Sequence, residues 1–197
     1  MSKKVEFYFD FGSPTAYLAF TQLPAIVARH GAEIAWRPVL LGGIFKSVGN
    51  RSPVEVIPKG RYMLEDLGRF AKRYGVPLRF NPYFPINTLP LMRGATAFQM
   101  YEPSRFPEYA RAMFHALWVE EKNMGDPAVI AQTMTGNGFS AEQIGTWTSD
   151  PAVKQKLIDD TNAAVERGLF GAPTMFVSGA MFFGQDRLDF VEEALAA

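Results

Sequence analysis

The feature that most constrains the fold is a strand that leads directly into a helix near the start of the chain. Residues 5–9 alternate in polarity, and residues 15–30 repeat apolar side chains at helical spacing. Between them, Ser13 stands at the expected N-cap and Pro14 at the first helical position, which together are a strong start signal. Residues 33–39 then alternate again. This β-α-β order predicts a parallel strand pair with a right-handed crossover.

The middle of the chain differs in composition. Residues 42–58 are rich in Gly, Pro, Ser and Asn, which predicts a long loop. After this segment the apolar residues recur at helical spacing. The predicted helices cover residues 59–74, 89–101, 106–122, 127–135 and 141–147.

The end of the chain returns to mixed helix and strand. Asp150 and Pro151 predict a helix start, and Ser178-Gly179 is typical of a two-residue hairpin turn. Asp186 is expected to cap a final helix. The predicted elements are a helix to about residue 167, strands over 174–177 and 180–183, and a helix over 187–196.

This order, β-α-β, a helical block and then α-β-β-α, matches an α/β fold in which a large all-helical insertion interrupts a thioredoxin-like core. We expect residues 1–40 and 150–197 to form the core and residues 41–149 to form the insertion. The length of 197 residues suits such a core with one insertion.

Composition excludes several function classes. The 20 basic and 20 acidic residues give no net charge, so we expect no nucleic-acid binding. The absence of cysteine excludes disulfides, thiolate metal sites and dithiol redox chemistry, and with only two histidines we expect no metal site. The longest charge-free run, residues 168–185, contains glycines and Pro173, which argues against a membrane helix. We therefore expect a cytoplasmic protein.

Ser13 has two interpretations. It could simply cap the helix, a contribution of about 1 kcal/mol. Alternatively, it could serve an anion brought from outside, because a helix start carries unpaired N–H groups and the positive end of the macrodipole. No Gly-x-Ser-x-Gly motif is present and His30 lies at the far end of the same helix, so we do not expect a nucleophilic serine. Donation of a hydrogen bond to a bound thiolate fits better.

Two later segments could complete such a site. In a thioredoxin-like core, the loop that holds Ala172 and Pro173 faces the start of the first helix. A cis-proline there would leave the N–H and C=O of Ala172 free to pair with a peptide-like ligand. Asp186 could either cap its helix or bind an ammonium group.

Taken in order and spacing, five motifs resemble one family across essentially the whole chain. The family is that of the 2-hydroxychromene-2-carboxylate isomerases, relatives of kappa-class glutathione transferases and of DsbA-like oxidoreductases. Ser13 stands where the redox relatives carry a nucleophilic cysteine. The motifs are FDFGSPTAY at 9–17, GN at 49–50, KGRY at 59–62, FGAPTMF at 170–176 and FGQDRL at 183–188.

The resemblance implies a homodimeric enzyme with glutathione as cofactor. Its expected reaction is the cis–trans isomerisation of 2-hydroxychromene-2-carboxylate to trans-o-hydroxybenzylidenepyruvate in naphthalene-type catabolism, so the substrate would be a small aromatic keto acid or chromene. Two alternatives stay open: a kappa-like transferase that conjugates electrophiles, and a glutathione-binding module without catalysis.

The resemblance also implies roles for individual residues. Ser13 would be catalytic and contact the glutathione sulfur, while Ala172 and Pro173 would bind the cysteinyl backbone. The residues implied for the γ-glutamyl end are Gln185, Asp186 and Arg187. Those implied for the remaining peptide and its glycine carboxylate are Asn50 and Lys59. Those implied for the substrate wall, under a helical roof, are Tyr83, Phe84 and Asn87.

Overall fold

A four-stranded sheet forms the centre of the computed structural model, which describes residues 3–197. The strands are β1 (Lys4–Phe9), β2 (Glu33–Pro38), β3 (Thr174–Val177) and β4 (Ala180–Phe183). They lie in the order β2-β1-β3-β4, with β1 and β2 parallel and β3 antiparallel to both β1 and β4. The predicted parallel pair and C-terminal hairpin are therefore confirmed. Ser178 and Gly179 form the hairpin turn with φ of 49° and 87°.

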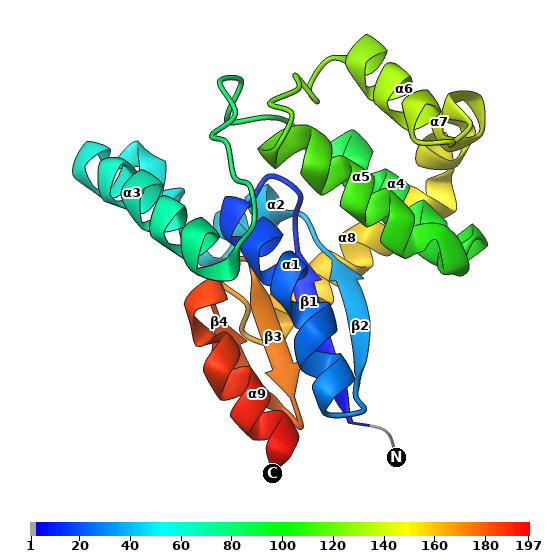
Figure 1. The fold of residues 1–197 in the computed structure, drawn as a ribbon. Helices are drawn as coiled ribbons and strands as arrows, with labels where there is room; N and C mark the ends of the chain where they lie inside the picture. Colours follow the sequence, from blue (N-terminus) through cyan, green and yellow to red (C-terminus); the bar gives the residue numbers. More distant parts are fainter. Residues whose placement is uncertain (1–2) are drawn as a thin grey trace.

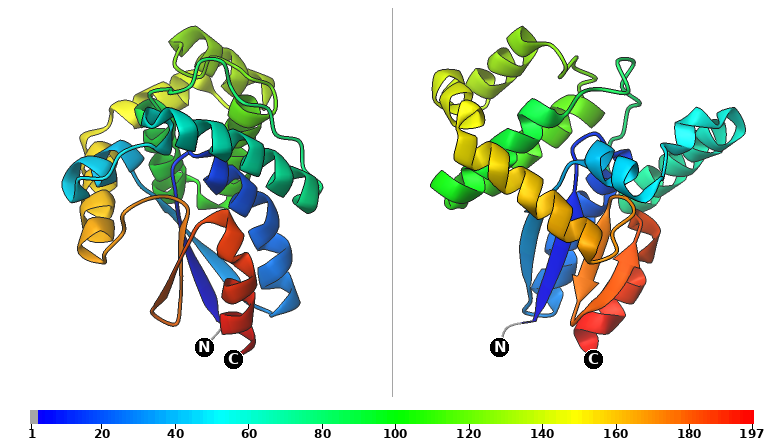
Figure 2. Two further views of the ribbon diagram at one scale, coloured as in Figure 1. Left: turned by 90° about the vertical axis from the view of Figure 1, so that its left-hand side faces the viewer. Right: turned by 180° about the vertical axis from the view of Figure 1, so that it is seen from behind.

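Helices cover both faces of the sheet because strand side chains alternate between them. Phe7 and Met175 pack with α1 (Pro14–Arg29) and α9 (Leu188–Ala196). Tyr8 and Phe176 point the other way and share a smaller apolar cluster with Ala164 of α8 (Pro151–Glu166). Figure 1 shows α1 and α9 in front of the sheet, and the rear view in Figure 2 shows α8 across its other side.

Most helices of the middle region gather beyond the carboxyl end of β1 (Figure 1). They are α4 (Leu89–Tyr101), η2 (Pro103–Arg105), α5 (Phe106–Trp118), α6 (Pro127–Gly136) and α7 (Ala141–Ser149). The Trp118 indole N–H donates to the Phe11 carbonyl at 2.8 Å, and the Phe11 and Phe114 ring centroids lie 4.8 Å apart. A continuous apolar cluster thus joins the sheet to these helices. The division at residues 41 and 149 stays a prediction.

The prediction of a long loop over residues 42–58 is wrong. This segment contains α2 and a 3₁₀ turn, followed by a helix that begins slightly earlier than expected. The elements are α2 (Leu41–Val48), η1 (Pro53–Glu55) and α3 (Ile57–Tyr74). Apolar side chains at helical spacing, with Ile44 fully buried, overcome the low helix propensity of the glycines. Gly49 then ends α2 in the left-handed conformation, with φ of 69°.

The predicted end of one helix and the predicted start of another differ from the structure. α5 ends at Trp118, not at residue 122, and Lys122 instead donates its N–H to the carbonyl of Ala116. Asp186 does not cap the last helix: it lies inside η3 (Gln185–Arg187), and α9 begins only at Leu188. The Asp186 carboxylate pairs instead with the Arg187 guanidinium at 2.6 Å.

Candidate functional site

The Ser13 hydroxyl lies where β1 ends and α1 begins. The Ser13 N–H donates to the Asp10 carbonyl at 3.0 Å, and this closes the turn between the two elements. The Ser13 Oγ accepts from the Ala16 N–H at 3.1 Å, so the predicted N-cap is formed. Only 3% of Ser13 is exposed. Capping therefore occupies one lone pair of a nearly buried hydroxyl.

The same hydroxyl reaches the loop before β3, which confirms the expectation that this loop faces the start of α1. Ser13 Oγ donates to the Ala172 carbonyl at 3.0 Å. The hydroxyl of Thr15 lies 2.8 Å from Ser13 Oγ and 3.3 Å from the same carbonyl. The Ala172-Pro173 peptide is cis.

The expectation that Ala172 offers both backbone groups to a ligand is half wrong. Its carbonyl already has a donor inside the protein, because the Ser13 and Thr15 hydroxyls both lie within hydrogen-bond distance of it. Its N–H has no hydrogen-bond partner among residues 3–197. The loop therefore presents a free donor and an occupied acceptor.

A buried carboxylate, Asp10, holds the Ser13 turn in place. Its Oδ1 accepts from the Gly12 N–H at 2.9 Å and the Thr88 hydroxyl at 2.7 Å, and its Oδ2 accepts from the Leu41 N–H at 2.9 Å. Burial raises the pKa of the Asp10 carboxyl, while these three hydrogen bonds oppose the rise. One side chain thus ties the turn before α1 to the starts of α2 and α4.

A cavity of about 350 Å³ opens beside Ser13. This volume falls in the range of small-molecule sites, about 300–1,000 Å³. Its walls come from the start of α1, from α2 and α3, and from the loops around residues 50, 84 and 171. The lining residues are Gly12, Ser13, Pro14, Thr15, Leu41, Phe45, Asn50, Arg51, Ser52, Pro53, Met63, Phe84, Phe170, Gly171, Ala172 and Phe183.

Asn50 and Lys59, the residues implied for the far end of a peptide ligand, are placed differently. Asn50 lines the cavity, and its side-chain amide donates to the Phe170 carbonyl at 2.8 Å. Lys59 lies outside the cavity, in a neighbouring polar hollow that also contains Asn50 and Arg51. This hollow brings two cationic side chains to the rim of the cavity.

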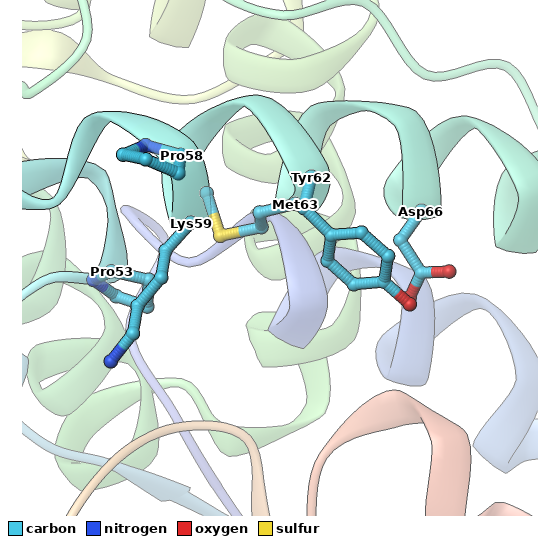
Figure 3. Close-up of a pocket in the computed structure, with 6 residues that line it drawn as sticks. All are labelled: Pro53, Pro58, Lys59, Tyr62, Met63 and Asp66. Carbon is cyan, nitrogen blue, oxygen red and sulfur yellow. The ribbon is translucent and has the colours of Figure 1, made fainter.

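A further hollow of about 410 Å³ follows the exposed face of α3. Figure 3 shows Lys59, Tyr62 and Asp66 leaving the same side of the helix. Met63 lines both this hollow and the cavity beside Ser13. The start of α1 contributes no side chain to it, so we place the chemistry in the other cavity.

Gln185, Asp186 and Arg187 do not line the cavity. The Gly184 N–H donates to the Pro173 carbonyl at 3.0 Å, which joins η3 to the cis-proline loop. The Tyr74 hydroxyl at the end of α3 donates to the Gln185 carbonyl at 2.5 Å. Burial is the main cause that raises the pKa of Tyr74 to about 12. Tyr74 therefore stays a neutral donor that fixes η3.

Only one of the three residues implied for the substrate wall lines the cavity. Phe84 does so, next to its cis bond with Pro85. Tyr83 is 53% exposed and stands outside the lining. Asn87 accepts from the Leu89 N–H at 3.1 Å and supports the start of α4 instead.

Sequence reasoning missed the second hydroxyl and much of the apolar wall. Thr15 is adjacent to the Ser13-Pro14 signal, and a search for further hydroxyls in that turn would have found it. Phe170 and Phe183, whose ring centroids lie 4.6 Å apart, belong to motifs whose other members carry the predicted site roles. Nothing in the sequence marks Phe45, in the segment predicted as a loop, or Met63, in the helix predicted over 59–74, as a cavity residue.

The described part of the chain contains neither a cluster of metal ligands nor a membrane-spanning helix. Residues 3–197 contain no group of three or more His, Asp or Glu side chains able to hold a metal ion. Within the same residues, no helix combines the length and apolar character needed to span a bilayer.

Comparison with known proteins gives consistent matches over the whole chain. Residues 4–196 match the family described as DSBA-like thioredoxin domain. A 2-hydroxychromene-2-carboxylate isomerase from Sphingobium xenophagum is 32% identical, with 99% of each chain covered. Glutathione S-transferase kappa 1 from Rattus norvegicus is 29% identical, covering 94% of this chain and 87% of its own. A solved structure of a 2-hydroxychromene-2-carboxylate isomerase superposes with a TM-score of 0.87 at 30% identity, covering 98% of this chain and 94% of its own.

Proposed function

This chain belongs to the DSBA-like thioredoxin domain family and, within it, to the 2-hydroxychromene-2-carboxylate isomerases, and from this we propose that it is a glutathione-dependent isomerase. Its proposed reaction converts 2-hydroxychromene-2-carboxylate to trans-o-hydroxybenzylidenepyruvate. That reaction would be one step in the breakdown of naphthalene-type aromatic compounds.

The observation that carries the proposal is the environment of Ser13. A hydroxyl that caps α1 lines a cavity next to the free N–H of Ala172. A thiol-bearing peptide needs a donor for its sulfur and a backbone donor for its own carbonyl, and these two groups supply both. The chain has no cysteine of its own, so a thiolate at Ser13 must come from a ligand.

When bound, glutathione would supply a nucleophilic sulfur whose reversible addition to a conjugated double bond permits rotation about that bond. Ser13 and the amino end of α1 would stabilise the charge on that sulfur, because both favour an anion. They would lower the pKa of the thiol from its free value of about 8.5 toward neutrality. The Ala172 N–H would orient the cysteinyl segment.

The remaining contacts that the family resemblance implies are part of the same proposal. Asn50 in the cavity and Lys59 next to it support binding of the glycine end, with its carboxylate. Gln185, Asp186 and Arg187 would meet the γ-glutamyl end once it extends past Pro173. Phe84 would form the aromatic wall, while Tyr83 and Asn87 would contribute from outside the lining.

A kappa-like transferase is the second candidate, because the kappa 1 relative is 29% identical over nearly the same span. Such an enzyme would use the same thiol site and release a conjugate. The Ser13 environment serves both reactions equally. A third reading, a glutathione-binding module without catalysis, requires only the binding residues.

We also propose a homodimer in the cytoplasm. Apolar side chains on α3 are unusually exposed, with Ile57 at 69% and Tyr62 at 62%, and this supports a partner surface. The cytoplasm holds reduced glutathione, which suits the proposed cofactor. Sedimentation of the purified protein at increasing concentration tests the dimer, since a monomer at every concentration would contradict it.

The test of the function is a pair of assays run side by side. The purified protein is given glutathione with either the chromene or a chlorinated aromatic acceptor, and Ser13→Ala is the control. We expect glutathione-dependent isomerisation that Ser13→Ala loses about 100-fold to 1,000-fold, the usual cost of one transition-state donor. Conjugate without isomerised product would establish the transferase instead. Glutathione binding without either reaction would establish the binding module.

A further inference from the structure

Two hydroxyls at the start of α1 share one backbone carbonyl. Ser13 Oγ lies 3.0 Å and Thr15 Oγ1 lies 3.3 Å from the Ala172 oxygen, and the two hydroxyl oxygens are 2.8 Å apart. Each hydroxyl has a single proton to donate. The three oxygens therefore form a small network in which two protons can be arranged in more than one way.

Two arrangements satisfy every group. In the first, Thr15 donates to Ser13 and Ser13 donates to the Ala172 carbonyl. In the second, Ser13 donates to Thr15 and Thr15 donates to the carbonyl. The Ser13 proton is used inside the protein in both arrangements, whereas stabilisation of a bound thiolate needs that proton to point into the cavity.

If Ser13 turned its proton toward a ligand without help, the buried Ala172 carbonyl would lose its best donor. A buried polar group left without a partner is costly. Thr15 is placed to prevent this loss, because its own proton can move to the same carbonyl while its oxygen stays beside Ser13. A valine at position 15 would have the same shape and no proton to give.

We propose that Thr15 is a positioning residue that takes over the Ala172 carbonyl and so frees the Ser13 proton for the glutathione thiolate. This inference rests on the proposed function, since it needs a thiolate in the cavity. Thr15 lines that cavity beside Ser13, so its side chain is close to the ligand as well. Its action is nevertheless assigned through Ser13, and this distinguishes it from a second direct donor.

The experiment measures the pKa of the bound glutathione thiol, from the ultraviolet absorbance of the thiolate during a pH titration. Wild type is compared with Thr15→Val and Thr15→Ser. We expect Thr15→Val to raise that pKa by about 0.5 to 1, which is a threefold to tenfold smaller ratio of thiolate to thiol at a given pH. Thr15→Ser restores the hydroxyl and should return the pKa to the wild-type value.

The Ser13→Ala background decides whether Thr15 acts through Ser13. There we expect Thr15→Val to cause no further rise, because no serine proton is left to free. An equal rise in both backgrounds would overturn the inference in favour of direct donation by Thr15. An unchanged pKa in Thr15→Val, with weaker glutathione binding, would overturn it in favour of a structural role.

Calorimetry with glutathione and thermal unfolding accompany each variant. If the wild-type protein binds no glutathione, the proposed function itself is refuted. If the wild type binds glutathione and Thr15→Val leaves the pKa of the bound thiol unchanged, only the inference is refuted. If Thr15→Val does not fold, Thr15→Ala removes the same proton with less bulk and should raise the pKa by the same amount.

Discussion

The two sides of the cavity are built differently. On the side of Ser13, polar groups are buried and mutually hydrogen-bonded, and Asp10 connects them to two other helices. On the opposite side, the first turns of α3 carry exposed apolar residues, and Asn50 ties the preceding segment to Phe170. Under the proposed function, the reaction chemistry would rest on a rigid junction of the core. Ligand selection would then rest on a peripheral segment that is more easily altered.

The largest effect, on the free energy of unfolding, is expected at Asp10, which holds the Ser13 side of the cavity together. Asp10→Asn should lower the free energy of unfolding by about 2–4 kcal/mol, because the amide nitrogen replaces one of the two carboxylate oxygens and cannot accept there. Either the Leu41 N–H, or the Gly12 N–H and the Thr88 hydroxyl, then lose their acceptor. Urea unfolding measures this change. It should also weaken glutathione binding, since the Ser13 turn loosens.

Asp126→Asn is the matched control for Asp10→Asn. Asp126 caps α6 through an exposed hydrogen bond, in which its side chain accepts from the Ala128 N–H. Asparagine caps helices about as well as aspartate, so the stability change should stay within about 0.5 kcal/mol. Equal effects at the two positions would show that the buried junction is no more rigid than an exposed helix start.

The apolar wall that Phe84 gives the cavity should respond with a change of substrate binding. Phe84→Ala should lower kcat/KM for the aromatic substrate about tenfold and leave glutathione affinity unchanged, because it removes part of an apolar wall. Tyr83→Ala, next in the chain but outside the lining, should have little effect. A larger effect from Tyr83 than from Phe84 would move the substrate wall to the outer face.

A smaller change is expected where α3 meets η3. Tyr74→Phe removes the donor to the Gln185 carbonyl and should weaken glutathione binding about threefold to tenfold, with kcat nearly unchanged. Isothermal calorimetry measures the affinity. Tyr101→Phe, which removes an exposed hydrogen bond to Asp150, should leave the affinity at the wild-type value. An unaltered glutathione affinity in Tyr74→Phe would show that the position of η3 does not matter for glutathione binding.

The smallest effect concerns Glu192, a half-buried residue of α9 whose carboxylate contacts Arg29 and His30 at the far end of α1. Hydrogen bonds from Arg29 and then His30 lower the pKa of Glu192 to about 2 from the 4.5 of an unperturbed glutamate. Because the folded-state pKa is lowered, the stabilisation is present above pH 4.5 and is lost as the pH falls toward 2. Solvent screening keeps the contribution small.

Unfolding of Glu192→Gln across that acidic range tests the assignment. The variant should lose the corresponding part of the pH dependence and differ little from wild type near neutral pH. A large loss of stability near neutral pH would contradict the account, since it would make an exposed pair as important as the buried Asp10 junction.

The sequence predicted those parts of the molecule whose signals are local. The Ser13-Pro14 helix start, the Ser178-Gly179 turn and both C-terminal strands are confirmed as predicted. α2 was missed because its glycines and the following Pro, Ser and Asn residues outweighed the apolar spacing, and the Asp10 carboxylate that binds its first N–H lies 31 residues earlier. The role proposed for Thr15 depends on Ala172, 157 residues away, so no local pattern indicates it. Which implied residues line the cavity is likewise a matter of tertiary packing.

The central claim is that Ser13 stabilises a thiolate that the ligand supplies. The most direct measurement is the pH titration of glutathione bound to wild type and to Ser13→Ala, followed by thiolate absorbance. Wild type should hold the thiol pKa clearly below the free value of about 8.5, and Ser13→Ala should move it back by about 1 or more. A thiol pKa that is the same in both proteins would contradict the account and leave Ser13 as a helix cap.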